Sequence, residues 1–329
     1  MLPVTEPLLS VRSLSVEFDA PGSGPFARRR TLRALDGVSF DLIRGETLGV
    51  VGESGCGKTT LARAILQLTP ASAGRVLLHG EDLSKLGRFA LRQRRRAMQL
   101  VFQDPLASLS PRMTIGEIIA EPLRAHAEGR DTGARKARVV AMMDRVGLLP
   151  GLYDRYPHEL SGGQCQRVGI ARALVLEPDL VVCDEPVSAL DLSVRAQIVN
   201  LLMDLQHEMG LALLFIAHDL SVVRQVSHRV LVMYLGRIME TAERDALFAA
   251  PRHPYTRALL DSVPVPDPTL ARARTVRTLP GDPPSPLDPP SGCVFRTRCP
   301  HAQPLCAERV PVLRQVGGSL VACHFAEDI

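Results

Sequence analysis

Apolar positions in the first fifty residues fall into short runs. Leu8 to Phe18 alternates imperfectly between apolar and polar residues, Val38 to Ile43 repeats that pattern, and Leu48 to Val51 is continuously apolar. A period of two indicates half-buried strands, and a short unbroken apolar run is typical of a buried strand. The chain is therefore expected to begin with β-structure. Residues 20–30 have loop composition and predict an insertion at a strand turn.

Helical spacing appears directly after this β-rich start. Leu61 to Leu68 follows the apolar run closely and ends near Pro70, which predicts a strand, a glycine loop and a helix in succession. Further along, Ile115 to His126 and Ala134 to Val146 read as helices. These two segments predict a helical insert over about residues 104–165.

From Gln164 onward, helical and strand patterns alternate. Helices are expected at 164–176, 193–208 and 219–226, and strands at Leu180–Cys183, Leu211–Ala217 and Val230–Tyr234. Alternating strands and helices indicate a mostly parallel sheet covered by helices. The predicted fold class is α/β.

The composition changes near residue 250. Pro251, Pro254 and the Pro-rich stretch Pro280 to Pro290 mark linkers, and four of the seven cysteines lie beyond them. We therefore expect a main domain over 1–250 and a smaller C-terminal extension over 251–329.

Composition and charge limit the classes of function. The net charge of +4 is mild, and with no Trp and 4% aromatic residues a nucleic-acid-binding role is not indicated.

The longest apolar stretches fall short of the roughly 18 to 20 residues of a membrane-spanning helix. The first ten residues lack a secretory signal pattern, so a cytoplasmic location is expected. The basic runs at Arg28–Arg30 and at Arg92 with Arg94–Arg96 are interpreted as solvated faces, with an anionic lipid or partner contact as the alternative.

The segment after Val51 carries the first chemical motif. Gly52 and Gly57 bracket four residues before Lys58 and Thr59, the spacing of a phosphate-binding loop whose backbone N–H groups surround phosphate oxygens. Lys58 would contact the β- and γ-phosphates of ATP and the Thr59 hydroxyl would coordinate Mg²⁺. The predicted nucleotide-binding residues here are Gly52, Ser54, Gly55, Cys56, Gly57, Lys58, Thr59 and Thr60.

Two adjacent acids follow the apolar strand Leu180–Cys183. Asp184 is the candidate Mg²⁺ ligand, and Glu185 is the candidate base or water-positioning group. An acid pair solvated at a strand end is the alternative. Together with the phosphate loop they predict only a nucleoside triphosphatase.

A narrower class comes from Leu160-Ser161-Gly162-Gly163-Gln164, which resembles the signature motif of the ABC ATPase family. Gln103, Asp191 and His218 lie in segments that resemble the Q-loop, D-loop and switch histidine of this family, in the family's order. The resemblance covers about residues 8–245. It implies a P-loop NTPase core of ABC type with an antiparallel β subdomain, a helical subdomain insert and a small C-terminal extension.

The same resemblance implies roles for individual residues. Lys58, Gln103, Glu185 and His218 would be catalytic, and Thr59, Gln103 and Asp184 would hold Mg²⁺. Ser161, Gly162, Gly163, Gln164 and Asp191 would serve the ATP of a second subunit. Phe18 stands where the family commonly places a ring against adenine, although an aromatic residue on a strand is more often part of the core.

Two longer segments resemble the ATPases of oligopeptide and dipeptide importers. These are the loop Phe102–Thr114 and the C-terminal stretches His253–Leu260 and Pro289–Pro300. The resemblance is best to the second ATPase subunit of that group. It implies a paralogous ATPase partner in a heterodimer, two membrane permeases, an extracytoplasmic solute-binding protein, and a place on the cytoplasmic face of the membrane. Nickel, glutathione or another small solute remains an alternative cargo, and a soluble non-transport ABC ATPase is a further alternative.

Four cysteines lie in the extension, separated by five, six and sixteen residues: Cys293, Cys299, Cys306 and Cys323. Disulfides fit a cytoplasmic protein poorly, and the spacing lacks the CxxC pairs of structural zinc sites. The spacing is compatible with an iron–sulfur cluster, with zinc or another metal, and with free thiols. Resemblance to the peptide-importer group implies a [4Fe-4S] cluster. Cys56, Cys165 and Cys183 are interpreted as small packing residues.

Overall fold

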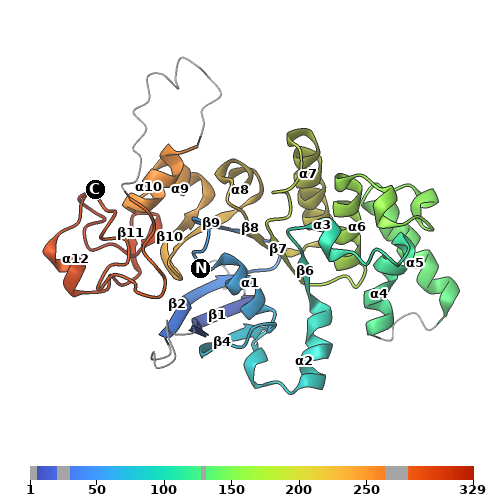
Figure 1. The fold of residues 1–329 in the computed structure, drawn as a ribbon, viewed down its shortest axis with the longest axis horizontal. Coiled ribbons are helices and arrows are strands. Elements are labelled where there is room, and N and C mark those ends of the chain that lie inside the picture. The colour runs from blue at the N-terminus through green and yellow to red at the C-terminus, as the bar shows by residue number, and fades with distance from the viewer. Residues whose placement is uncertain (1–5, 21–29, 127–130, 264–280) are drawn as a thin grey trace, which may run out of the picture. The chain divides into compact units, whose positions relative to one another are not determined.

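The computed structural model describes residues 6–20, 30–126, 131–263 and 281–329 (Figure 1). The chain forms two compact units, each of which collects segments that are distant in sequence. The first unit contains residues 1–9, 42–47 and 78–216, and the second contains 10–41, 48–77 and 217–329. Most of the loop predicted at residues 20–30 lies outside the described residues, as does Pro280 at the start of the predicted linker.

Three parallel strands form the centre of the first unit. They are β6 (Met98–Val101), β7 (Leu180–Asp184) and β8 (Ala212–Ile216). In the shared register, Val182 of β7 is opposite Leu100 of β6 and Leu214 of β8. Every residue of β7 and β8 is buried, as the unbroken apolar runs predict for strands covered on both faces. The predicted parallel pairing is confirmed for these strands.

The helical insert also belongs to the first unit. Its main helices are α4 (Ile115–Ala125), α5 (Thr132–Arg145) and α6 (Gly162–Leu174), which Figure 1 shows as a group drawn in green. Thr114 caps α4 through a reciprocal pair of hydrogen bonds with Glu117, which fixes where the helix begins. The predicted helices are thus present, with ends shifted by one or two residues.

The first unit contains further helices, a short strand and several 3-10 turns. They are β5 (Glu81–Asp82), α2 (Arg88–Arg94), α3 (Pro105–Ser108), α7 (Leu192–Met209) and 3-10 turns at Leu83–Lys85, Arg95–Ala97, Pro150–Leu152 and Pro157–Glu159.

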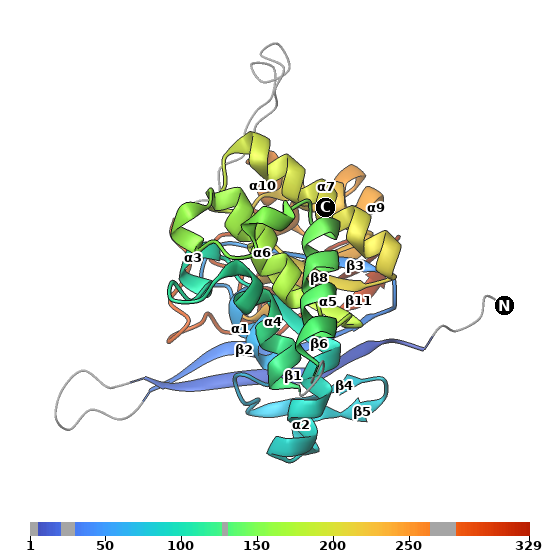
Figure 2. The same ribbon diagram turned by 90° about the vertical axis from the view of Figure 1, so that its right-hand side faces the viewer.

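The second unit contains the β-rich start of the chain. Strands β1 (Leu9–Ala20), β2 (Arg30–Leu42) and β4 (Ala73–Leu78) are ordered β2-β1-β4, and Figure 2 shows β1 and β2 running side by side. In another sheet, β3 (Thr47–Val51) pairs in parallel with β9 (Arg229–Tyr234). Helices α1 (Lys58–Ile65) and α8 (Leu220–Val226) follow strands, as the alternating pattern predicts.

The C-terminal segment adds strands to the sheet that contains β9. β10 (Arg237–Glu243) pairs antiparallel with β9, and β12 (Ser319–Val321) pairs antiparallel with β10 and with β11 (Arg314–Val316). The helices here are α9 (Arg244–Ala249), α10 (Pro254–Asp261) and α12 (Pro304–Glu308). Residues 319–321 therefore extend a sheet that begins before residue 60. The domain division at residue 250 stays a prediction.

Among the described helices, none has both the length and the apolar character needed to span a bilayer.

Candidate nucleotide site

The phosphate loop joins β3 to α1 in the second unit. Gly52 approaches the backbone of β9 so closely that an added Cβ would lie 2.2 Å from the carbonyl oxygen of Met233. Gly57 has a φ of 105°, in the left-handed region, and an added Cβ would lie 2.5 Å from the carbonyl oxygen of Ala34. Because neither position accepts a side chain, glycine fixes the path of the loop.

Lys58 occupies the first turn of α1 and is buried, with 6% of its surface exposed. Its Nζ donates to the carbonyl oxygens of Gly52 at 2.7 Å and Glu53 at 3.0 Å. The ammonium group is thus held over the loop, at the positive end of a helix. This arrangement attracts anions such as phosphate.

The remaining loop residues differ in their exposure to solvent. Ser54, Gly55 and Thr59 are exposed, and Thr60 is half-buried. Cys56 is buried, and burial raises the pKa of its thiol. Burial also raises the pKa of Cys165, and that of Cys183 to about 12. These buried, protonated thiols agree with the interpretation of all three cysteines as packing residues.

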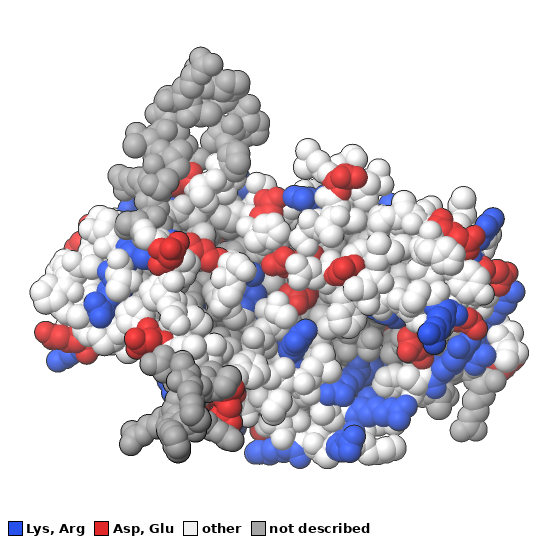
Figure 3. All heavy atoms as spheres, in the orientation of Figure 1, with Lys and Arg blue, Asp and Glu red and all other residues white. Residues whose placement is uncertain are grey.

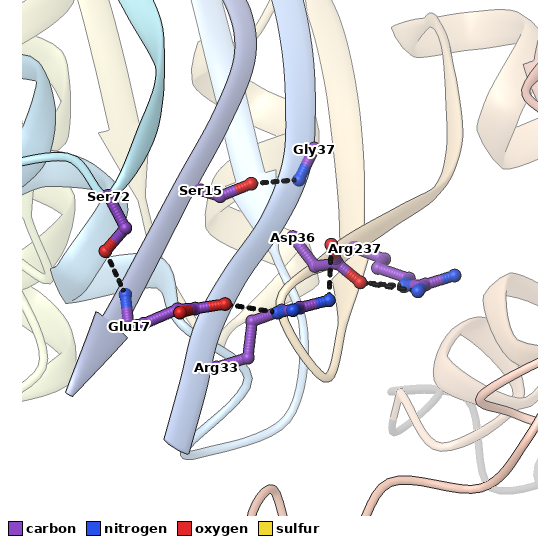
Figure 4. A network of polar contacts seen from close by, with 7 residues as sticks. All are labelled: Ser15, Glu17, Arg33, Asp36, Gly37, Ser72 and Arg237. Carbon is purple, nitrogen blue, oxygen red and sulfur yellow. Dashed lines mark hydrogen bonds and ion pairs between the residues drawn. The ribbon is translucent and has the colours of Figure 1, made fainter. Parts of the chain in front are cut away.

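Phe18 lies near the end of β1 with 42% of its surface exposed, so it is not a core residue. The strand end beside it is held by an ion-pair chain, shown in Figure 4. Arg33 Nε donates to Glu17 at 2.8 Å, and Arg33 and Arg237 both pair with Asp36, at 3.4 and 2.5 Å. The chain of charges therefore ties β1 and β2 to β10.

Asp184 and Glu185 stand at the end of β7 in the first unit. Asp184 is buried, and Glu185 has a φ of 49°, an unfavourable backbone conformation for a residue with a side chain. The Glu185 N–H donates to Ile216 O at 3.0 Å, and Gln103 Nε2 donates to Glu185 Oε2 at 3.1 Å. The structure thus brings together Gln103 and Glu185, which are 82 positions apart.

The signature segment forms the beginning of α6. Ser161 caps the helix and shares a reciprocal hydrogen-bond pair with Gln164. Ser161 and Gly162 are exposed. An added Cβ on Gly163 would lie 2.5 Å from Val194 of α7, whereas on Gly162 its nearest neighbour would be 3.8 Å away. Gly163 therefore allows the close approach of α6 and α7, while a Cβ on Gly162 would make an ordinary van der Waals contact with Leu190.

Asp191 and His218 are both exposed at element boundaries. Asp191 precedes α7 in the first unit, and Ser188 Oγ in the same loop donates to Glu185 O at 3.0 Å. His218 follows β8 and belongs to the second unit. Each compact unit thus holds part of the predicted set: Phe18, the phosphate loop and His218 in one, and Gln103, Ser161–Gln164, Asp184, Glu185 and Asp191 in the other.

Sequence reasoning did not identify three residues that bear on the phosphate loop: Glu53, Tyr255 and Arg298. Tyr255 and Arg298 contact Glu53 across 202 and 245 positions. No local pattern signals such contacts, although both residues fall in stretches that resemble the peptide-importer extension.

None of the four cysteines of the extension takes part in a disulfide. Burial raises the pKa of Cys293 and Cys323, and that of Cys299 to about 11, while backbone N–H groups directed at the sulfur atoms act in the opposite direction. The thiols also lie near enough to influence one another's charge. Within the described ranges, no three His, Cys, Asp or Glu side chains are grouped so as to hold a metal ion.

The basic run Arg92 with Arg94–Arg96 lies on and after α2, where Figure 3 shows Lys and Arg side chains gathered. Arg92 donates to Ala125 O at 2.5 Å, and Arg94 pairs with Glu81. These contacts agree with the interpretation as a solvated, partly paired face.

The α/β fold, the phosphate loop before α1 and the acid pair at the end of β7 are those of a P-loop nucleoside triphosphatase. Residues 35–188 match the family model described as ABC transporter, and residues 239–306 match the model of the oligopeptide/dipeptide transporter C-terminal region. Among solved structures, the dimeric ATP-binding cassette MJ0796 bound to ADP and Pi has a TM-score of 0.64 at 26% identity, covering 72% of this chain and 98% of that one. The cbiO1 subunit from Clostridium perfringens has a TM-score of 0.64 at 28% identity, covering 74% and 91%.

The curated relatives are more similar still. The oligopeptide transport ATP-binding protein OppF of Salmonella typhimurium is 56% identical over 318 residues, covering 96% of this chain and 95% of the relative. OppF of Haemophilus influenzae is 55% identical over 321 residues, covering 97% of each. The chain belongs to the ABC transporter ATP-binding family, in its oligopeptide/dipeptide group, and is an ATPase.

Proposed function

We propose that this chain is the ATP-hydrolysing subunit of an importer for oligopeptides or dipeptides. The observation that carries the proposal is the near full-length similarity to oligopeptide transport ATP-binding proteins, which includes the transporter-specific region at residues 239–306. The soluble, non-transport alternative does not account for that region.

The residue roles in this proposal rest on the order of the motifs and on family membership. Lys58 neutralises phosphate charge, Thr59, Gln103 and Asp184 hold Mg²⁺, and Glu185 and His218 orient the attacking water. Phe18 stacks on adenine. The bound Mg²⁺ would supply charge neutralisation at the transferred phosphoryl group. The hydrogen bond from Gln103 to Glu185 supports a shared task for these two side chains.

A second ATPase subunit is part of the proposal. Ser161, Gly162, Gly163, Gln164 and Asp191 would contact the ATP bound by a paralogous partner, so that ATP closes the pair and hydrolysis opens it. The exposure of the signature segment supports this role, as does Leu192, which is 80% exposed directly after Asp191. An exposed apolar side chain beside a motif residue suits a surface that a partner covers.

Permease docking is assigned to the segment around Gln103. Phe102 and Leu106 are large apolar residues with 46% and 54% of their surface exposed. They flank Asp104, which caps the short helix α3 through a bond from Ala107 N at 3.0 Å. We place the chain against two membrane permeases at the cytoplasmic face of the membrane, with a solute-binding protein outside.

The decisive experiment co-purifies the chain with its membrane partners and reconstitutes them in vesicles with the binding protein. ATPase activity is measured with peptides of two to five residues, nickel or glutathione present, and a Glu185→Gln complex serves as the inactive control. Stimulation by peptides supports the proposal. Stimulation only by nickel or glutathione assigns the chain to that cargo instead. ATPase activity that is the same with and without the membrane partners contradicts a transport role.

We also propose that Cys293, Cys299, Cys306 and Cys323 hold a [4Fe-4S] cluster. A single zinc ion with bonds of about 2.3 Å draws its four sulfurs close together, whereas a cluster of four irons separates them more widely. The described residues contain no preformed group of three metal-ligating side chains, so the proposal rests on the match of residues 239–306 to the oligopeptide/dipeptide transporter C-terminal region. The N–H groups of Phe295, His301 and Phe325 point at these sulfurs and would stabilise thiolate ligands.

Iron and acid-labile sulfide are measured after anaerobic purification, with zinc measured in the same sample. About four irons and four sulfides per chain would support the cluster, as the assignment requires. Zinc without sulfide, or no metal at all, would show that the cluster assignment is wrong.

A further inference from the structure

Glu53, the second residue of the phosphate loop, is held at both its backbone and its side chain by the C-terminal extension. Its N–H donates to the Tyr255 hydroxyl oxygen at 2.9 Å. Its carboxylate accepts two bonds from Arg298, from Nη1 at 2.7 Å and from Nη2 at 3.1 Å. A residue between two proposed cluster cysteines therefore contacts the loop that binds phosphate.

The contact between Arg298 and Glu53 is a two-bond ion pair with a buried guanidinium and a partly buried carboxylate. The Arg298 side chain is 7% exposed and that of Glu53 is 26% exposed. Such forked pairs are stronger and more directional than ordinary surface ion pairs, and lysine cannot reproduce them. The guanidinium also lies 5.9 Å from the centre of the Tyr234 ring, which fixes its position from a second side.

Tyr255 is fully buried in an aromatic cluster. Its ring lies 4.8 Å from that of Tyr234 and 5.3 Å from that of Phe295. Burial raises the pKa of the phenol, so the hydroxyl stays neutral and accepts the Glu53 N–H without competition from ionisation. A ring held by two neighbours gives a fixed anchor point for the loop.

Glu53 transmits these contacts to the rest of the loop. Its carbonyl oxygen accepts the bond from Lys58 Nζ at 3.0 Å, next to the bond from Lys58 to Gly52 at 2.7 Å. The carboxylate, the peptide group and the lysine thus form one connected series from Arg298 to the cation that would meet phosphate. Pre-forming such a loop lowers the ordering cost when a nucleotide binds.

We propose that Arg298 and Tyr255 are positioning residues for ATP binding, which hold Glu53 and so keep the phosphate loop in its binding conformation. The nucleotide affinity of the chain then depends on the order of the segment Cys293–Cys299. The inference requires that the chain binds ATP but does not depend on the cargo or on the cluster.

The test compares two arginines of the same segment. Arg296 donates to Ser291 O at 2.9 Å, just before this segment and away from the phosphate loop, and provides the matched control. The dissociation constant of a fluorescent ATP analogue and the values of KM and kcat for ATP are measured for Arg298→Met, Arg298→Lys and Arg296→Met. We expect Arg298→Met to weaken binding about tenfold, which corresponds to about 1.4 kcal/mol, chiefly through KM. Arg298→Lys should recover part of the loss, and Arg296→Met should stay within about twofold of wild type, as expected for a partly exposed site.

Unchanged affinity in a folded Arg298→Met protein would overturn the proposal, as would equal losses for both arginine variants. If Arg298→Met folds poorly, a double-mutant cycle of Arg298→Lys with Glu53→Gln keeps the proposal falsifiable. If Arg298 acts through Glu53, the double variant binds ATP no more weakly than the weaker-binding single variant, whereas additive losses contradict the proposal.

Tyr255→Phe keeps the ring and removes only the hydroxyl that accepts the Glu53 N–H, so it should also raise KM with kcat little changed. An unchanged KM would remove Tyr255 from the assignment.

Discussion

Glu185 combines a left-handed backbone φ of 49° with two fixed hydrogen bonds, one at its N–H and one at its carboxylate. Strain of this kind costs of order 1–3 kcal/mol and persists where the surroundings hold it in place. Here Ile216 and Gln103 provide those restraints. At the scale of single residues, the position and direction of the candidate base are therefore set by neighbours from two different segments.

Replacing Glu185 with Gln should remove turnover while leaving ATP binding intact. Gln has the same shape and an oxygen that can still accept from Gln103, but it cannot accept a proton from water. A loss of about 10²- to 10⁴-fold in kcat is expected for a missing general base. Steady-state ATPase activity and equilibrium binding of ATP check the prediction, with Glu185→Asp as the control that keeps the charge. Normal turnover in the Gln variant would remove Glu185 from the catalytic role.

His253 predicts a dependence of stability on pH. It is fully buried, accepts from Tyr255 N at 3.0 Å, and burial lowers its pKa to about 3. Below the unfolded value of about 6.5, the unfolded chain binds a proton that the folded chain does not, so stability falls as the pH drops. At pH 5.5 the loss from this group is about 1.4 kcal/mol relative to pH 8.

His253→Asn keeps an acceptor for the Tyr255 N–H and removes the titration. Urea unfolding followed by tyrosine fluorescence at pH 5.5 and pH 8 should show a smaller pH effect in the variant than in the wild type. The same pH effect in both proteins would show that the acid sensitivity lies elsewhere.

At the scale of elements, two adjacent glycines at the start of α6 differ in how closely they approach their neighbours. Gly162 and Gly163 are adjacent and look equivalent in sequence, yet an added Cβ would overlap a neighbour only at Gly163, where Val194 of α7 lies 2.5 Å away. Packing against a neighbouring helix explains why position 163 is glycine, whereas the contacts within the described residues do not explain the glycine at position 162.

This difference predicts opposite effects of two alanine substitutions. Gly162→Ala should leave stability unchanged or raise it by up to about 1 kcal/mol, since alanine favours a helix over glycine. Gly163→Ala should lower stability by about 1–3 kcal/mol, because its Cβ would overlap Val194. Chemical denaturation measures both, and Val194→Ala should rescue Gly163→Ala. Equal effects of the two substitutions would contradict the packing argument.

At the scale of the whole molecule, the C-terminal extension is integrated with the phosphate-loop unit. β12 pairs with β10, and the buried carboxylate of Glu240 accepts from the backbone N–H groups of Arg252 and His253, at 2.8 and 2.9 Å. Tyr255 and Phe295 pack on Tyr234 at the end of β9. The extension therefore supports the unit that contains the nucleotide-binding loop.

A chain truncated after Ala250 should not retain a stable phosphate loop. It loses the strand beside β10 and the backbone N–H groups that pair with Glu240. It also loses the aromatic side chains that cover Tyr234. Losing buried apolar contacts and leaving a buried carboxyl group without its partners both lower stability. Soluble yield, thermal unfolding and ATP binding are compared with the full chain, and the full chain carrying Glu240→Gln shows how much the buried charge alone contributes. A truncated chain that is soluble and binds ATP with wild-type affinity would contradict this prediction.

Much of the architecture could be read from local pattern. The unbroken apolar runs at β3, β7 and β8, and the succession of strand, glycine loop and helix around Gly52–Thr59, each need only neighbouring residues, so these elements were predicted correctly. β11 and β12 have three residues each, too few for a periodic signal. These strands form because β10 offers an edge to pair with, which a linear pattern does not contain.

The sequence by itself determined the class of protein, because the glycine, lysine, acid and signature motifs each require particular residue types at fixed spacing along the chain. Only the tertiary structure decided which side chains restrain them: Gln103 on Glu185, Val194 against Gly163, and Tyr255 and Arg298 on Glu53. The physical reason is that hydrogen bonds and packing act over a few ångströms in space, whatever the separation along the chain. For Glu53 that separation exceeds two hundred residues, and folding brings its partners to within 3.1 Å.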